Sequence, residues 1–452
     1  MSRTYRSQYK EKLISAEKAA GMIVSGDCIL YGGFLGRPID FDQELAKRKD
    51  ALNDVLIYLS TSLLPPPATA ISDPSHKHFT CNSFYFSAVD RKMSDNNLMF
   101  YLPCNLHESQ TFFEHDYFPP FTAVVQVSPM DEHGFFSFGP SNVYNFTVCM
   151  SAKTVVLEVN NNMVRVPGGS EDAIHISMVD YVIEGSNPPL FEYPNTANPS
   201  EVDLAMAKLL LEEIEDRSCL QLGFGNLPDL LGKLICDSNL KDLGIHSEMF
   251  CNSMVELFDR GLVTNRYKAI DRGKIGFSFC LGTKETYEFI SGNPLMASYP
   301  ASFSNNPRTI AMNDKVVSIN NALEIDLFSQ VCSESSGFRQ ISGTGGQLNF
   351  VEGAYYSRGG KSFLCLTSTY TDKKGELHSR IVPTLAPGGI VTTPRASVDY
   401  IVTEYGKECL KGRSTWARAE KLVNIAHPDF RDDLIKEAEK MNIWRLSNKL
   451  EQ

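Results

Sequence analysis

Short apolar segments alternate along the chain with segments whose apolar residues recur at helical spacing. Amphipathic stretches at 15–23 and 42–48 predict helices, the first of them capped by Ser15. Six apolar runs predict the strands of the first half: 28–31, 55–59, 121–129, 135–139, 154–159 and 180–184. Short buried strands that alternate with helices are typical of βαβ units, so the pattern predicts a largely parallel sheet with helices on its faces.

The order of elements at the start of the chain begins again after residue 200. A helix, a strand, a glycine-rich break and a proline follow one another at 15–38 and again at 202–228. The next strand ends near Ser60 in the first copy and at Glu248 in the second. The repetition predicts an α/β protein with two tandem, similar open α/β domains.

A proline-rich segment separates the two copies. Residues 185–199 contain four prolines together with Asn, Ser and Gly, which can neither pair in a central strand nor continue a helix. We therefore predict a first domain at 1–187, a linker at 188–200 and a second domain at 201–452. Because active sites favour domain interfaces, the site is expected between the domains.

Charge and composition limit the classes of partner and the cellular location that are expected for this protein. The net charge of −11 disfavours nucleic acid or an anionic membrane as a partner. No apolar run approaches the roughly 18 to 20 residues that cross a bilayer, and the start of the chain lacks the apolar core of a secretory signal. The 11 cysteines are dispersed and mostly flanked by apolar residues, which indicates reduced core thiols. A cytoplasmic location is expected.

Glu248 is the best single candidate for chemistry. The apolar stretch from Leu243 reads as a buried strand that ends at Glu248, and ligands of open α/β sheets bind outside the carboxyl ends of the strands. The alternative is a carboxylate that caps the helix beginning near Asn252, which is the commoner role for an acid at a helix start.

A glycine-rich loop at 343–347 is the second candidate. Gly343, Gly345 and Gly346 leave no side chains to obstruct a ligand and allow backbone N–H groups to point at it, although a simple tight turn is equally compatible with the pattern. Neither this loop nor the one at 223–228 fits G-x-G-x-x-G or the phosphate-binding P-loop. The sequence therefore disfavours a nicotinamide-dependent enzyme and an enzyme that transfers phosphoryl groups from nucleotides.

Other polar residues are expected to have structural roles. His76 and His78 lie in a polar segment without further metal ligands, and the cluster 131–133 reads as a solvated turn. Glu404 follows a strand in a tail that also contains Arg395, so a structural ion pair is expected. His246 is expected to be structural, and no metal site is predicted.

Several blocks together resemble the acetyl-CoA hydrolase/CoA-transferase family, in particular its carboxylate CoA-transferases. The resemblance covers nearly the whole chain, and its most specific blocks are 244–249, 343–347, 379–383, 391–395, 402–406 and 426–431. It implies two similar domains of the CoA-transferase (NagB/RpiA-like) fold, an active site between them, and a homodimer or higher homo-oligomer.

The resemblance also implies roles for residues. Glu248 corresponds to the nucleophile, and Asn305 to a side-chain amide near it, the alternative being a turn asparagine before proline. Backbone N–H groups of the glycine loop are suitable oxyanion donors. The predicted catalytic set is Glu248, Gly345, Gly346, Gln347 and Asn305, and the predicted CoA-binding set is Gln221, Gly223, Gly225, Gly343, Gly345 and Gly346.

The expected reaction moves CoA between butyryl-CoA or 4-hydroxybutyryl-CoA and acetate. A carboxylate is ionised at neutral pH, so the exchange needs a nucleophile but no general base, no metal and no cofactor beyond the CoA substrate. The alternatives are hydrolysis of the same intermediate and a non-catalytic acyl-CoA sensor. Asn349, Phe224 and Leu35 depart from the family pattern and are expected to bear on the acyl pocket.

Overall fold

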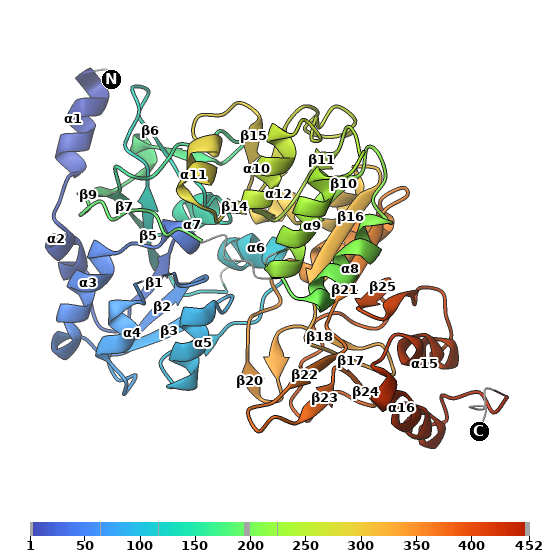
Figure 1. The fold of residues 1–452 in the computed structure, drawn as a ribbon. Helices are drawn as coiled ribbons and strands as arrows, with labels where there is room; N and C mark the ends of the chain where they lie inside the picture. Colours follow the sequence, from blue (N-terminus) through green and yellow to red (C-terminus); the bar gives the residue numbers. More distant parts are fainter. Residues whose placement is uncertain (1–2, 64, 116, 194–198, 224, 448–452) are drawn as a thin grey trace.

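The computed structural model describes residues 3–63, 65–115, 117–193, 199–223 and 225–447. Two largely parallel sheets, one from each half of the chain, lie side by side, the first half in blue to green and the second in green to red (Figure 1). This agrees with the predicted fold class. The exact domain boundaries stay a prediction, and part of the predicted linker, 194–198, lies outside the described residues.

The first sheet contains seven strands, and every neighbouring pair is parallel. Its order is β4 (Phe100–Tyr101), β3 (Phe79–Ser83), β2 (Val55–Leu59), β1 (Cys28–Tyr31), β5 (Phe121–Val127), β7 (Thr154–Val159) and β9 (Tyr181–Glu184). The helices of this half are α1 (Arg3–Lys12), α2 (Ala16–Gly21), α3 (Asp40–Lys47), α4 (Ala68–Ser72), α5 (Ala88–Asp95), α6 (Ser109–Glu114) and α7 (Asn145–Ser151). Ser15 caps α2 as predicted.

The second sheet has six strands, of which only the last is antiparallel to its neighbour. Its order is β11 (Gly244–Ile245), β10 (Cys219–Leu222), β16 (Val316–Asn321), β21 (Lys361–Cys365), β25 (Tyr400–Thr403) and β26 (Gly406–Cys409). The helices are α8 (Glu201–Leu211), α9 (Asn226–Cys236), α10 (Asn252–Asp259), α11 (Lys284–Ile290), α12 (Ala301–Ser304), α13 (Pro307–Ala311), α14 (Gln347–Tyr356), α15 (Thr415–Asn424) and α16 (Pro428–Lys440).

The two sheets share a core topology. The series β2-β1-β5-β7-β9 in the first half matches β11-β10-β16-β21-β25 in the second, and the first strand pairs centrally in both. The glycine that follows that strand also makes the same contact: Gly32 N–H donates to Val124, and Gly223 N–H donates to Ile319, both at 3.0 Å. The structural repetition predicted from the sequence is confirmed.

Small sheets join and extend the two large ones. They are β6 (Phe135–Ser137) with β8 (Ala173–His175), β12 (Met249–Phe250) with β14 (Phe279–Cys280), β13 (Ile275–Phe277) with β15 (Met296–Ser298), β17 (Glu324–Asp326) with β18 (Val331–Cys332) and β24 (Ile381–Val382), β19 (Ser335–Ser336) with β20 (Arg339–Gln340), and β22 (Thr369–Thr371) with β23 (Leu377–Ser379).

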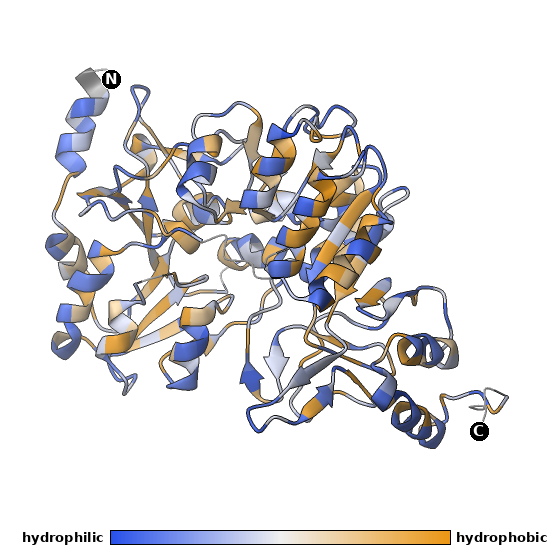
Figure 2. Cartoon of the chain, viewed as in Figure 1, coloured by the Kyte–Doolittle hydropathy of each residue, from blue (hydrophilic) through white to orange (hydrophobic). Residues whose placement is uncertain are grey.

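Apolar residues fill the interior and cross between the halves. The strands are mainly hydrophobic, and helices such as α1, α3 and α16 turn hydrophilic residues outward (Figure 2). One continuous cluster of buried apolar residues contains side chains of both sheets, from Leu30 to Val402. The faces where the halves meet are therefore packed like a core, which holds the two sheets in a fixed relation. Ten of the eleven cysteines are buried, as their apolar flanks predicted. No helix in the described ranges combines the length and apolar character needed to cross a bilayer.

Candidate active site between the two sheets

A cavity of about 930 Å³ lies between the halves and takes its walls from both. Of the predicted site residues, the cavity is lined by Gln221, Gly223, Glu248, Gly343, Gly345, Gly346 and Gln347. Asn305 lies behind Glu248, and Gly225 is not among the lining residues but immediately precedes α9, with φ at +118°. Tertiary structure thus brings together residues that are far apart in the sequence.

The backbone around Glu248 leaves the second sheet. The strand predicted to end at Glu248 ends at Ile245, because the following residues pair with another segment: Ser247 N–H donates to the Gly276 carbonyl at 3.0 Å. The Glu248 carbonyl then accepts N–H groups of Ser278 at 2.9 Å and Phe279 at 3.1 Å. These contacts fix the bend that directs the Glu248 side chain to the cavity.

Two donors hold the Glu248 carboxylate. Asn305 Nδ2 lies 2.5 Å from Oε2, and the Gly346 backbone N–H donates a second hydrogen bond. A Cβ on residue 346 would lie 1.8 Å from Oε2 and 2.3 Å from Asn305 Nδ2, so only glycine allows this approach. The turn role considered for Asn305 falls instead to Asn306, whose side chain caps α13.

Burial changes the charge of the site. Loss of solvent raises the pKa of Glu248 to about 7, although the hydrogen bonds from Asn305 and Gly346 lower it. The carboxyl group is therefore partly protonated at neutral pH, not fully ionised as an ordinary glutamate would be. A raised pKa in a cleft marks a candidate functional group, and here the geometry supports the same assignment.

The glycine loop is shaped by tyrosines of the first half. Added Cβ atoms at Gly343 and Gly345 would each lie 3.0 Å from the ring of Tyr85, and Gly345 has a φ of +53° that favours glycine. The backbone N–H of Thr344 donates to the Tyr101 hydroxyl at 2.9 Å. The loop therefore packs directly against the opposite half while its last glycine reaches Glu248.

The predicted glutamines are fixed by polar neighbours. Gln347 Oε1 accepts hydroxyl groups of Ser333 at 2.8 Å and Thr393 at 3.1 Å, and its Nε2 donates to the Asn321 carbonyl at 2.8 Å. Its side chain therefore has a structural role, and the predicted role of its backbone N–H at the start of α14 stays a prediction.

Gln221 has the same kind of environment. Its Oε1 accepts Ser318 Oγ at 2.7 Å and Asn320 Nδ2 at 3.1 Å. This network ties β10 to β16 at the carboxyl ends of the strands and holds Gln221 in one orientation at the cavity wall.

Sequence reasoning missed the aromatic wall. Phe34 and Phe279 come from different halves, stack with ring centroids 3.9 Å apart, and both line the cavity. Phe34 has a φ of +53°, which is rare for a bulky residue and marks local strain. Its place inside the first glycine-rich break was a usable signal. Tyr85 had no comparable signal, because only the fold brings it to the loop.

Two of the departures from the family pattern, Asn349 and Leu35, lie outside the cavity wall. Asn349 Nδ2 lies 2.8 Å from His107 Nδ1, and Leu35 packs in the core, so neither is in the cavity wall itself. That these two residues bear on the acyl pocket stays a prediction. Phe224 lies outside the described residues.

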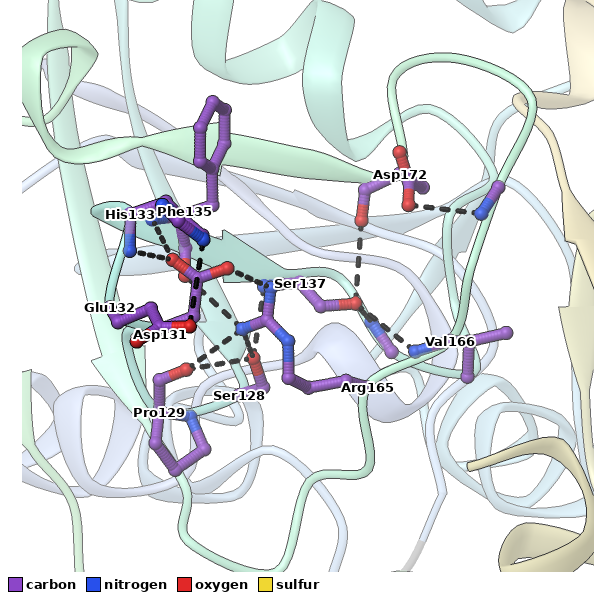
Figure 3. Close-up of polar contacts among 12 residues, drawn as sticks. Ser128, Pro129, Asp131, Glu132, His133, Phe135, Ser137, Arg165, Val166 and Asp172 are labelled. Carbon is purple, nitrogen blue, oxygen red and sulfur yellow. Dashed lines mark hydrogen bonds and ion pairs between the residues drawn. The ribbon is translucent and has the colours of Figure 1, made fainter. Parts of the chain in front are cut away.

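Other polar candidates have structural partners. Asp131 accepts backbone N–H groups of His133 and Phe135, each at 2.9 Å, and pairs with Arg165 at 2.9 Å, so it stabilises a turn (Figure 3). Glu404 accepts hydrogen bonds from the backbone N–H and hydroxyl of Ser368 rather than forming the expected ion pair.

The histidines are also engaged. His78 Nδ1 lies 2.6 Å from the Leu52 carbonyl, and the buried His246 contacts the Ser304 carbonyl at 2.8 Å. Asp372, Glu376 and His378 form the one group of possible metal ligands found in the described ranges, on the β22–β23 hairpin, and none of them lines the cavity.

Comparison with known proteins defines the class. Residues 1–190 match the acetyl-CoA hydrolase/transferase N-terminal domain, and residues 282–438 match the C-terminal domain of the same family. The chain belongs to the acetyl-CoA hydrolase/transferase family, and it is a CoA-transferase.

Particular relatives agree over nearly the full length. The chain is 47% identical over 443 residues to a probable butyrate:acetyl-CoA coenzyme A-transferase of Syntrophomonas wolfei subsp. wolfei, covering 98% of each chain. It is 45% identical to the butyryl-CoA:acetate CoA-transferase of Anaerostipes caccae, covering 99% of this chain and 100% of the relative. The crystal structure of RipA from Yersinia pestis superposes with a TM-score of 0.88 at 37% identity, covering 98% and 100%.

Proposed function

We propose that this enzyme moves CoA between butyryl-CoA and acetate through a covalent thioester on Glu248. The single observation that carries the proposal is the position of the Glu248 carboxylate: it faces the cavity between the halves, 2.5 Å from Asn305 Nδ2 and within a hydrogen bond of Gly346 N–H. The substrates follow from the names of the relatives described above.

The first half-reaction splits the thioester. Ionised Glu248 attacks the acyl carbonyl carbon, the C–S bond breaks, and CoA leaves as a thiolate, which gives an acyl-glutamyl anhydride. The thiolate then attacks the glutamyl carbonyl carbon, and butyrate leaves with the electron pair of the broken C–O bond. Acetate reverses both steps to give acetyl-CoA. Charges balance throughout, so no proton donor or acceptor is required.

Asn305 and Gly346 are suited to the transition states. Attack on the glutamyl carbonyl places an oxyanion on an oxygen of Glu248 itself, next to the two N–H donors that already bind the carboxylate. Such donors are worth about 3 to 4 kcal/mol each when they are preorganised in a site shielded from water. A desolvated carboxylate is also the better nucleophile once it is ionised, since water no longer stabilises its charge.

The walls favour an uncharged acyl chain. Phe34, Met249 and Phe279 line the cavity, and among its described lining residues Glu248 is the one acid, while Arg91 and Lys92 on α5 are the cations. 4-Hydroxybutyryl-CoA is the alternative donor, since the hydroxyl groups at 60–62 also line the cavity. Competition between the two thioesters at equal concentration distinguishes them.

Trapping tests the covalent step. Incubation with butyryl-CoA followed by borohydride should reduce the glutamyl thioester and change the intact mass of the protein, with Glu248 as the modified residue in peptide mapping. Glu248→Ala should show no change. Modification of another carboxylate, or full turnover by Glu248→Ala, would overturn the assignment.

Acetate dependence tests the transferase reaction. Transfer predicts that butyryl-CoA is consumed only when acetate is present, whereas a hydrolase releases free CoA at the same rate without it. Binding of butyryl-CoA without either reaction would favour the sensor.

Location and assembly are part of the proposal. The burial of ten cysteine thiols is compatible with a reducing cytoplasm, and the family resemblance favours a homodimer or higher homo-oligomer. Light scattering at working concentration measures the assembly directly.

A further inference from the structure

The amide of Asn305 contacts a different partner at each end. Its Nδ2 donates to Glu248 Oε2 at 2.5 Å, and its Oδ1 accepts the Ser304 hydroxyl at 2.9 Å. Both Ser304 and Asn305 are fully buried. Because an amide donates only through nitrogen and accepts only through oxygen, a hydroxyl that donates to Oδ1 favours the orientation in which Nδ2 faces the carboxylate.

Ser304 is itself held in place through its backbone carbonyl. It is the last residue of α12, and its carbonyl lies 2.8 Å from Nε2 of the buried His246. Burial lowers the pKa of His246 to about 4, so the ring is neutral and the proton is on Nε2, the nitrogen that faces the carbonyl. The other acceptor within reach of the Ser304 hydroxyl is the Pro300 carbonyl at 3.4 Å, which is farther away than Asn305 Oδ1.

A reversed amide would conflict with an ionised Glu248. Turning Asn305 by half a rotation would place Oδ1 against the carboxylate oxygen, so that two acceptors would meet without a proton between them. The reversed state is acceptable only when Glu248 is protonated and donates to Oδ1. The orientation of Asn305 and the proton on Glu248 are therefore linked.

We propose that Ser304 is a positioning residue for CoA transfer: its hydroxyl fixes the Asn305 amide with N–H toward Glu248 and so favours the ionised, nucleophilic carboxylate. The inference rests on the proposed function of Glu248. Ser304 acts through Asn305 and does not line the cavity.

Other ionisable groups near Glu248 are left in place by changes at Ser304. Tyr85 follows β3 and interacts electrostatically with Glu248, with Arg91 of α5 and with Glu334 before β19. His246 contacts the Ser304 carbonyl and not its hydroxyl. A shift of the pH profile on removing the hydroxyl would therefore report the amide orientation.

The test compares Ser304→Ala, Ser304→Thr and Ser298→Ala in the full-length enzyme, with butyryl-CoA and acetate. Ser298 is the matched control because its hydroxyl is equally buried but has no hydrogen-bond partner in the described part of the chain. For Ser304→Ala we expect kcat to fall about tenfold, KM for butyryl-CoA to stay within about twofold, and the acidic limb of kcat/KM to move up by about half a pH unit or more. Ser304→Thr should restore both readouts, and Ser298→Ala should match wild type.

The double variant Ser304→Ala/Asn305→Ala distinguishes a positioning role of Ser304 from a general loss of structure. Once Asn305→Ala has removed the amide, Ser304→Ala should cause no further loss, because the hydroxyl acts only through Asn305. An equal loss in both backgrounds would overturn the proposal. If Ser304→Ala does not fold, Ser304→Cys replaces it as a weaker donor of similar size, and the same direction of pH shift is required.

Trapping on wild type keeps the two hypotheses apart. If borohydride modifies no glutamate of the wild-type enzyme, the covalent function fails. If Glu248 is trapped but Ser304→Ala has a wild-type pH profile and kcat, the covalent function stands and the positioning role alone is wrong.

Discussion

The two halves share a five-strand core, yet one presents a carboxylate to the cavity and the other a serine. Counting along the paired strands β1–β2 and β10–β11 places Ser60 at the register position of Glu248. In the first half β2 runs for five residues and the Ser60 carbonyl accepts Phe34 N–H at 3.0 Å. In the second half β11 has two residues, and the chain then turns to pair with Gly276.

The difference lies in the backbone as much as in the side chain. Early departure from the sheet lets Glu248 reach Asn305 and Gly346, whereas Ser60 stays tied to its own glycine-rich turn. The first half contributes walls instead, through Phe34 and Tyr85. One scaffold, repeated, therefore supplies the proposed nucleophile from one copy and the enclosure from the other. Each of the following changes tests that division.

Alanine substitution at the two register-equivalent positions, Glu248 and Ser60, should give the largest difference in activity. Glu248→Ala removes the proposed nucleophile and should lower kcat by on the order of 10⁴-fold or more, whereas Ser60→Ala should cost less than about tenfold. Steady-state kinetics of both variants measures the contrast. Comparable losses in the two would show that the halves share the chemistry.

Substitution of Gly346, the glycine next to the Glu248 carboxylate, should have the next largest effect on kcat. Gly346→Ala places a methyl group where Oε2 now lies and displaces a donor, so kcat should fall about 10² to 10³-fold. Gly21→Ala in α2 is the control, because its added methyl group meets nothing within 4 Å. Near-normal turnover by Gly346→Ala would remove the glycine loop from the site.

The raised pKa of Glu248 predicts a stability cost at high pH. The unfolded chain releases this proton near pH 4.5 and the folded chain near 7, so folding binds the proton in that window and stability falls as pH rises through it. Glu248→Gln has no proton to lose. It should be more stable than wild type at pH 8 by up to about 3 kcal/mol, less where solvent screens the group, and the gain should shrink toward pH 5. Urea unfolding at both pH values measures it, and a pH-independent difference would contradict the raised pKa.

The smallest effect is expected at the aromatic wall. Phe34 lies three residues after β1, and Gly225 lies three residues after β10. Both have positive φ. Phe34→Gly gives the first half the residue that the second already has, relieves the strain and removes one ring of the Phe34–Phe279 stack. We expect hexanoyl-CoA to gain about tenfold in kcat/KM relative to butyryl-CoA. An unchanged ratio would place the acyl chain elsewhere.

The predictable part of the fold was the repeating part. The strands at 28–31, 55–59 and 219–222 were predicted correctly because each is a short apolar run bounded by turn residues. The start of α2 was predicted because Ser15 is a residue type that caps helices. The strand that was predicted to end at Glu248 ends three residues earlier, at Ile245. The chain beyond it pairs with Gly276, and the local sequence pattern does not reveal that partner.

For the candidate site, the sequence pointed to Glu248, Asn305 and the glycine loop, all of which meet in the structure. It did not point to Tyr85 or the Phe34–Phe279 stack, whose members are joined only by the docking of the two halves. Nor did it show that Asn349 and Leu35 lie outside the cavity wall, since adjacency in sequence does not determine which way a side chain points.

The sequence by itself determined the alternation of strands and helices, the repetition of the two halves and the residue types available for chemistry, since these follow from local periodicity and side-chain identity. Tertiary structure alone decided that Glu248 is desolvated, that Gly346 and Asn305 donate to the same carboxylate, and that the first half closes the cavity. Those properties depend on distances between segments brought together by packing, and distance in space is what sets dielectric screening and hydrogen bonding.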